Sequence, residues 1–144
     1  MSVGCYGSFG SPTNLNPKMI CGIGVDIADV AKVARSIDQY GERYLNKVFS
    51  PAEIEYCRKA AISTQRYAAR LAAKEAAMKA LSTGCTEEVS WRNFEVINEE
   101  SGQPKLEANG KAAELLAELR VSRIWISLTH NPEYAIAYVV LERD

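Results

Sequence analysis

The sequence predicts an α+β fold, in which a small, mostly antiparallel sheet packs against helices. The first observation is an alanine-rich run at 66–80, which contains strong helix formers and no Gly or Pro. The second is a set of short apolar runs with strand-like composition, at 19–27, 123–127 and 134–141. The third is the order of the elements, β-α-α-α-β-β-α-β-β, which shows no repeated unit and ends in a hairpin.

Composition indicates one globular domain without a general affinity for nucleic acid or membranes. The chain has 144 residues, 47% of them apolar, and a formal net charge of −1. A charge this small provides no global field to attract nucleic acid or an anionic lipid surface. The apolar runs are much shorter than the ~20 residues that span a bilayer. We therefore expect no nucleic-acid partner and no membrane association.

The chain divides at residue 18. Residues 1–18 are rich in Gly, Ser, Pro and Asn and lack the basic and apolar regions of a signal peptide. We expect a flexible extension there, natural or introduced by cloning, followed by the domain at 19–144. The four cysteines, Cys5, Cys21, Cys57 and Cys85, form no C-x-x-C pair. This spacing favours reduced thiols and a cytoplasmic location over a zinc site or a disulfide scaffold.

The first half of the domain reads as one strand followed by helices. The run at 19–27 predicts a buried strand, and its two glycines allow another group to approach the strand backbone closely. Helical spacing of apolar residues continues from Asp29 to about Val48. Ser50, Pro51 and Glu53 form a capping box with a proline at the first helical position, which starts a short helix ending near Lys59.

The central helix is predicted from about Thr64 to Leu81. Ser63 and Thr64 are candidate N-caps, and Gly84 is a candidate stop. The second half then predicts a strand within 89–98, a turn at 101–104, a strand at 105–107, a helix at 111–119, a strand at 123–127, a turn at 129–133 and a strand at 134–141.

Asp26 is the first candidate functional residue. Strands are depleted in Asp, and a buried carboxylate requires a partner. One interpretation is that Asp26 caps the following helix, a role that Asp29 would also fill. Asp26 lies inside the apolar run rather than after it. Its position therefore favours a functional role.

Glu75 is the second candidate, on the central helix. At about 100° per residue, Arg66, Arg70 and Lys74 share one stripe, whereas Glu75 lies at the edge of the adjoining apolar stripe. The simple interpretation is an alanine-rich core helix with a solvated basic edge and a surface ion pair from Glu75 to Lys79. The alternative is that Glu75 binds a cation from outside the helix. A hard divalent cation shared with Asp26 is the simplest such partner, and magnesium typically takes one or two protein carboxylates together with phosphate oxygens.

Five motifs occur in order and at fixed spacing across residues 19–144. They are GIGVDI at 22–27, FSxxE at 49–53, RLAAKEA at 70–76, GxP at 102–104, and SLTH at 127–130 followed by YA at 134–135. Together they resemble the holo-[acyl-carrier-protein] synthases, the short bacterial type of the 4′-phosphopantetheinyl transferase superfamily. Residues 1–18 match none of these motifs.

The resemblance implies transfer of 4′-phosphopantetheine from coenzyme A to a serine of apo acyl carrier protein, in fatty acid biosynthesis. It implies that Asp26 and Glu75 hold Mg²⁺. Lys74 is the expected direct phosphate contact, and Arg70 contacts phosphate or holds Glu75. Glu75, or a water that it orients, is the expected base. The identity of that base stays open between the two.

The resemblance also implies the surroundings of coenzyme A. His130, the one histidine, is expected at the coenzyme A pocket as a phosphate ligand, against the alternative of a turn-stabilising or exposed side chain. Gly102 and Pro104 are expected to line the nucleotide side, against the alternative of an ordinary hairpin turn.

Chains of this length in the family form homotrimers with sites between subunits, so we expect a homotrimer. The basic residues Lys32, Arg35 and Arg43 are candidates for docking the acidic carrier protein, against the alternative of a solvated helix face. The competing functional hypothesis is a non-catalytic regulatory protein of the same fold that binds coenzyme A or a nucleotide. A third hypothesis, a helical interaction module that uses the basic stripe, leaves Asp26 unexplained.

Overall fold

The computed structural model describes residues 17–84 and 88–144. Most of the expected N-terminal extension, at 1–18, therefore lies outside the described residues, as do Cys5 and Cys85. The other two cysteines, Cys21 and Cys57, are free thiols. No helix in the described part of the chain is both long and apolar enough to cross a bilayer.

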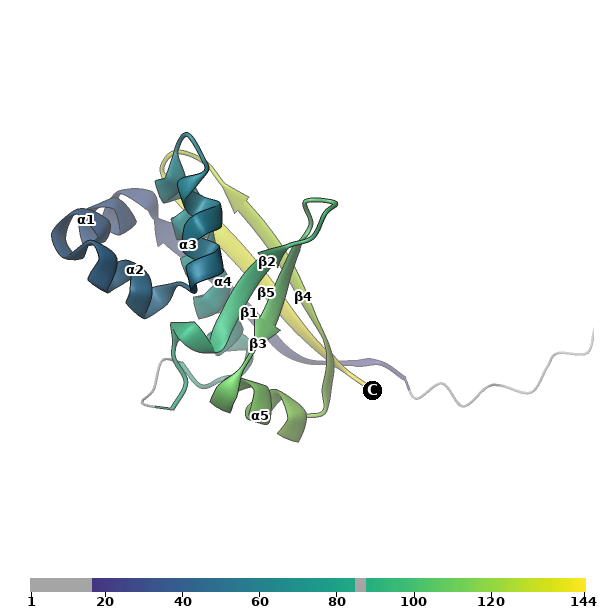
Figure 1. Ribbon diagram of the computed structural model, residues 1–144. Helices are drawn as coiled ribbons and strands as arrows, with labels where there is room; N and C mark the ends of the chain where they lie inside the picture. The colour runs from purple at the N-terminus through teal and green to yellow at the C-terminus, as the bar shows by residue number, and fades with distance from the viewer. Residues whose placement is uncertain (1–16, 85–87) are drawn as a thin grey trace, which may run out of the picture.

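The predicted α+β class is confirmed (Figure 1). In chain order the described elements are β1 (Met19–Asp29), α1 (Val30–Tyr40), α2 (Glu42–Val48), α3 (Pro51–Arg58), α4 (Ser63–Ala80), the 3-10 turn η1 (Trp91–Asn93), β2 (Phe94–Asn98), β3 (Pro104–Ala108), α5 (Gly110–Glu118), β4 (Val121–His130) and β5 (Tyr134–Arg143).

Two antiparallel sheets form the β layer. The larger has the order β1-β5-β4, and β2 pairs with β3 as a separate hairpin. In the larger sheet Asp26 is opposite Ala137, and Tyr138 is opposite Ser127. Met19 pairs with Arg143, so the start of β1 and the end of the chain lie side by side (Figure 1).

Helix α4 packs on one face of this sheet because β1 presents glycines to it. A Cβ atom at Gly24 would lie 1.8 Å from the carbonyl oxygen of Ala76, and one at Gly22 would lie 2.3 Å from that of Ala80. No side chain fits such spaces. The two glycines predicted a close approach to the strand, and the structure shows that the approaching group is the backbone of the alanine-rich helix. This contact places Asp26 beside α4.

The other face of the sheet is exposed, which corrects the prediction that β1 is a buried strand. Side chains on β5 alternate, with Ala135, Ala137 and Val139 buried and the residues between them exposed. The large apolar residues of β1 point to the exposed face because the glycines and Ala28 face α4. The exposed apolar face, as we call it below, comprises Met19, Ile23, Val25, Ile27, Trp125, Tyr134, Ile136 and Tyr138.

The helix predicted from Asp29 to Val48 is two helices. Gly41 adopts φ 56° between α1 and α2, a left-handed conformation that ends the first helix at Tyr40. The predicted capping box is confirmed: the backbone N–H of Glu53 donates to Ser50 Oγ, and the backbone N–H of Ser50 donates to Glu53 Oε1.

Other boundaries differ from the predictions at the ends of elements. Ile62 is the N-cap of α4 and makes no side-chain cap bond, so the predicted Ser63 or Thr64 cap is wrong. The predicted strand within 89–98 begins only at Phe94, after η1. His130 belongs to β4, because the strand pairing continues into the segment predicted as a turn.

Candidate active site

Asp26 faces a cation rather than a helix N-terminus. Its Oδ1 lies 2.7 Å from Nζ of Lys79, which also donates to the carbonyl oxygen of Val25 at 3.1 Å. The cap of α1 is Asp29, whose Oδ1 accepts from the backbone N–H of Lys32. The alternative interpretation of Asp26 as a helix cap is therefore wrong.

Glu75 lies on α4 one turn before Lys79, but the two do not form the predicted ion pair, because Lys79 reaches across to Asp26. Glu75 Oε1 instead accepts a hydrogen bond from the indole Nε1 of Trp91, at 3.2 Å. The Glu75 charge also acts on Tyr44: burial first, and this negative charge second, raise the pKa of the Tyr44 phenol. The partly buried carboxylate of Glu75 thus accepts its hydrogen bond from an uncharged indole N–H group.

Asp26 and Glu75 line the same pocket, of about 430 Å³, which we call the acidic pocket. The strand and the helix meet closely here, so residues distant in the sequence converge. The remaining lining residues come from β1, α1, α4 and the start of β5: Ile27, Ala28, Asp29, Lys32, Val33, Leu71 and Tyr134.

The carboxylate oxygens of the acidic pocket are suitable ligands for a hard divalent cation. Carboxylate oxygens are the ligands that Mg²⁺ prefers, and it usually takes only one or two of them. Within residues 17–84 and 88–144, no group of three or more His, Cys, Asp or Glu side chains is gathered as in a metal site. Of the three acidic residues that line the pocket, Asp29 caps α1, which leaves Asp26 and Glu75 to match the magnesium pattern in a pocket large enough for phosphate oxygens.

A second pocket, of about 310 Å³, collects Arg70, Gly102, Pro104 and His130. We call it the basic pocket. These are the four residues, apart from Lys74, that the family resemblance assigns to coenzyme A. Tyr56, Arg66, Ala69, Asn98 and Leu128 complete the lining.

Arg70 is the best-fixed cation of the basic pocket. It is only 4% exposed. Its Nη2 donates to Asn98 Oδ1 at 2.6 Å, and its guanidinium lies 4.2 Å from the ring centre of Tyr56. Its Nε is buried with no hydrogen-bond partner. His130 is exposed beside it, with Nδ1 2.9 Å from Gln65 Oε1.

Lys74 contradicts the prediction of direct phosphate contact. Its side chain is 0% exposed, and Nζ donates to Glu53 Oε1 at 2.6 Å and to the carbonyl oxygen of Val48 at 2.7 Å. Burial lowers the pKa of Lys74, while the Glu53 charge opposes that effect. The stripe predicted as a solvated basic edge is therefore mostly interior, because Arg70 is buried too.

Lys79 is the cation that sequence reasoning assigned to the wrong role. Its side chain is 54% exposed, and its ammonium group lies against Asp26 of the acidic pocket. Its position one turn after Glu75 was visible in the sequence. What the sequence lacked was the location of β1, whose carboxylate draws Lys79 away from Glu75.

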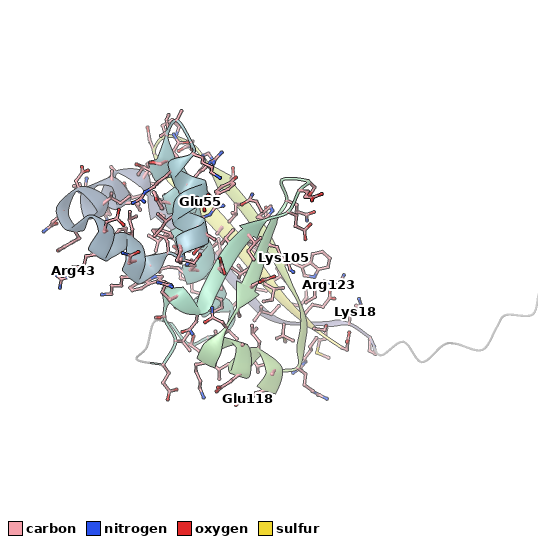
Figure 2. The ribbon with its side chains drawn as sticks, viewed as in Figure 1. Lys18, Arg43, Glu55, Lys105, Glu118 and Arg123 are labelled. Carbon is pink, nitrogen blue, oxygen red and sulfur yellow. The ribbon has the colours of Figure 1, made fainter. Side chains whose placement is uncertain are left out.

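Of the three docking candidates, one lies at the acidic pocket. Lys32 lines that pocket directly. Arg43 lines a different cavity, of about 330 Å³, together with Tyr40, Tyr44 and Lys47. Figure 2 shows the Arg43 side chain pointing outward from α2. Arg35, on α1, is also exposed.

Comparison with known proteins identifies the family. A sequence model of the 4′-phosphopantetheinyl transferase superfamily matches residues 22–139. The holo-[acyl-carrier-protein] synthase of Koribacter versatilis is 46% identical over 124 residues, which cover 86% of this chain and 99% of that protein.

Solved structures agree. The crystal structure of holo-[acyl-carrier-protein] synthase from Neisseria meningitidis superposes with a TM-score of 0.77 at 31% identity, covering 85% of this chain and 98% of that one. The enzyme from Bacillus anthracis, in complex with CoA (3′,5′-ADP), gives 0.73 at 31% identity, covering 88% and 99%. This chain belongs to the 4′-phosphopantetheinyl transferase superfamily.

Proposed function

We propose that this enzyme transfers 4′-phosphopantetheine from coenzyme A to a serine hydroxyl of an apo acyl carrier protein, and so acts as a holo-[acyl-carrier-protein] synthase. The serine oxygen forms a bond to the β-phosphorus of the pyrophosphate, and the bond from that phosphorus to the bridging oxygen breaks. Adenosine 3′,5′-bisphosphate leaves. The observation that carries the proposal is the convergence of Asp26 and Glu75 on one pocket.

Asp26 and Glu75 are the residues that would hold Mg²⁺. When bound, a magnesium ion neutralises charge on the pyrophosphate oxygens. Lys79 supplies a positive charge next to one of these two carboxylates, because its ammonium group lies 2.7 Å from Asp26 Oδ1. We therefore assign the role of phosphate-facing cation to Lys79, in place of Lys74.

Glu75 accepts the proton of the attacking serine, directly or through a water that it orients. Its place on the wall of the acidic pocket supports this role, because a base must lie within hydrogen-bond reach of the proton that it accepts. The hydrogen bond from Trp91 uses Oε1. A carboxylate offers about four lone-pair sites, so further ligands are accommodated.

The basic pocket would hold the nucleotide end of coenzyme A. Arg70 is rigidly placed there and has an unpaired buried Nε–H. A guanidinium in this setting suits a phosphate, and it is less strongly hydrated than an ammonium. His130, Gly102 and Pro104 line the same pocket as Arg70.

We propose that the working unit is a homotrimer. The acidic and basic pockets are lined by different residues of one protomer, whereas coenzyme A carries its pyrophosphate and its nucleotide on one molecule. A neighbouring copy would join one pocket to the other. The exposed apolar face supports such an assembly, because contiguous apolar patches of this kind mark interaction surfaces.

The carrier protein would dock near the acidic pocket. Lys32 on its rim, with Arg35 and Arg43 nearby, presents positive charge to an acidic partner. Charge of this kind speeds association and makes it salt-sensitive. We place the reaction in the cytoplasm, which suits the free thiols of Cys21 and Cys57.

The test is to incubate the protein with coenzyme A, Mg²⁺ and an apo carrier protein, and to weigh the carrier by mass spectrometry. We expect a gain of one phosphopantetheine, abolished by a chelator. Asp26→Asn and Glu75→Gln should each lower the rate by at least about 10²-fold. The control is Glu118→Gln, because Glu118 is an exposed acid on α5 (Figure 2). An unchanged carrier mass with retained coenzyme A binding would instead support the non-catalytic binding protein.

A further inference from the structure

The 3-10 turn η1 brings a tryptophan onto the proposed metal ligand. Trp91 is partly buried, and its indole Nε1 donates to Glu75 Oε1 at 3.2 Å. An indole N–H is a donor only, so it cannot withdraw a proton from Glu75 or compete with it for a cation. The contact therefore fixes one oxygen of the carboxylate without neutralising it.

Backbone hydrogen bonds hold the turn that carries Trp91 in place. The backbone N–H of Ser90 donates to Asn93 Oδ1 at 2.9 Å, and the backbone N–H of Asn109 donates to the carbonyl oxygen of Asn93 at 2.9 Å. These bonds close η1 and tie it to the start of α5. The indole N–H that donates to Glu75 therefore belongs to a turn that is held by backbone hydrogen bonds.

Helix α2 braces the same turn from the other side. The guanidinium of Arg92 donates to the carbonyl oxygen of Asn46 at 2.8 Å. Lys47 places its ammonium group 5.9 Å from the centre of the Trp91 ring. A cation over the ring face favours this ring orientation.

We infer that Trp91 is a positioning residue for Glu75: its indole N–H sets the orientation of the carboxylate that receives the cation. The inference rests on the proposed function, because it takes Glu75 as a metal ligand. Groups that hydrogen-bond to a metal ligand typically change metal affinity or activity by about 10- to 100-fold when they are removed. A fixed carboxylate also loses less rotational freedom when the ion binds.

The chain contains a matched control. Trp125 on β4 also donates from its indole to a carboxylate, Glu142 Oε2, at 3.3 Å. That pair lies outside the acidic pocket. Trp91→Phe and Trp125→Phe therefore each remove one indole–glutamate hydrogen bond and keep an aromatic ring, but only the first removes a contact to Glu75. Because Trp125 also belongs to the exposed apolar face, the two variants are compared only in Mn²⁺ binding and at the same oligomeric state, checked by light scattering.

The first measurement is the affinity of the full chain for Mn²⁺, as a spectroscopic substitute for Mg²⁺, by electron paramagnetic resonance. We expect Trp91→Phe to bind Mn²⁺ about 10-fold more weakly and Trp125→Phe to bind it as the parent does. In the transfer assay at saturating Mg²⁺, the rate of Trp91→Phe should recover much of its loss while KM for coenzyme A stays unchanged. Parental Mn²⁺ affinity in folded Trp91→Phe overturns the inference.

The second measurement does not require Trp91→Phe to fold. In the Trp125→Phe variant all tryptophan fluorescence comes from Trp91. Mn²⁺ should quench this emission with saturation, Mg²⁺ should reverse the quenching, and Glu75→Gln in the same background should abolish it. Trp91 fluorescence that does not change when Mn²⁺ is added overturns the inference. The mass-spectrometric transfer assay is independent of both readouts, so a catalytically active chain with these negative results rejects the role of Trp91 alone.

Discussion

The ammonium nitrogen of Lys74 lies 2.6 Å from Glu53 Oε1, and neither side chain has any exposed surface. Glu53 also accepts hydrogen bonds from the backbone N–H groups of Ser50 and Val96. One carboxylate therefore ties together the start of α3, the middle of α4 and β2. The residue next to Glu75 in the sequence thus belongs to the core, and this arrangement orients the face of α4 that carries Glu75.

Removing Lys74 should be costly for stability. We expect Lys74→Met to lower the free energy of unfolding by about 3–5 kcal/mol, because the Glu53 carboxylate would remain buried without its cation. Urea denaturation measures this loss. The control is Lys59→Met, whose ion pair with Glu55 is exposed and should contribute no more than about 0.5 kcal/mol. Equal effects of the two substitutions would show that burial of the Lys74 pair is unimportant.

Lys79 should matter for catalysis and little for stability. We expect Lys79→Met to lower the transfer rate by about 10²-fold or more, since a cation at the phosphate is lost, as for other groups that stabilise developing charge. The thermal midpoint should change little, because the side chain is 54% exposed. Lys105→Met is a matched control, because Lys105 is also 54% exposed and also pairs with a carboxylate, that of Glu107. A fully active Lys79→Met enzyme would remove Lys79 from the mechanism.

The backbone contact between β1 and α4 should tolerate no side chain. A methyl group at Gly24 would meet the carbonyl oxygen of Ala76 at 1.8 Å. We expect Gly24→Ala to lose about 3 kcal/mol or more, and also to weaken Mn²⁺ binding, because the strand carrying Asp26 must move away from α4. Gly41→Ala serves as the comparison. It has no atom within 4 Å of its added methyl, and only its φ of +56° costs about 1–2 kcal/mol.

Cys57 should make stability fall at high pH. Burial raises the pKa of this thiol from 9.0 to about 11, with the nearby Arg70 charge partly opposing the change. Between these two values the unfolded chain has lost the thiol proton while the folded chain retains it. The contribution of Cys57 is thus constant below about pH 9 and declines as the pH rises to about 11.

Denaturation at a series of pH values measures this decline. Cys57→Ala should be less stable overall because it leaves a cavity, but its stability should fall less between pH 9 and 11 than that of the parent. Alkylation of the native protein at mild alkaline pH should correspondingly spare Cys57 and modify it only after denaturation. Rapid native alkylation of Cys57 would contradict its burial.

The exposed apolar face should hold the assembly together. If the chain is the proposed trimer, we expect Ile136→Glu to convert it to monomers, because the substitution places a charge in the middle strand of that face. Light scattering after size exclusion measures the mass, and transfer activity should fall in parallel. Ile62→Glu is the control, since Ile62 is 62% exposed but precedes α4 rather than lying on the sheet. A parent chain that is already monomeric and active would refute the trimer proposal.

The sequence alone determined the features that depend on local chemistry. The alanine-rich run made α4, and the capping box at Ser50 and Glu53 started α3, because both signals act within a few residues. The glycines of β1 correctly indicated a close backbone approach. Asp26 and Glu75 stood out because each carboxylate lies in an apolar setting that its neighbours in the chain do not explain.

Tertiary structure decided which charged side chain faces which partner. Lys74 and Lys79 are both near Glu75 in the sequence, and helical periodicity predicts only that they point in different directions. Lys74 is buried because its ammonium group donates hydrogen bonds to Glu53 and to the Val48 carbonyl oxygen, both distant in the sequence. Lys79 instead forms an ion pair with Asp26. Helical periodicity in the sequence gives the angle between two side chains on one helix. Whether a charged side chain is buried depends on hydrogen-bonding partners from other elements, which only the folded structure brings close.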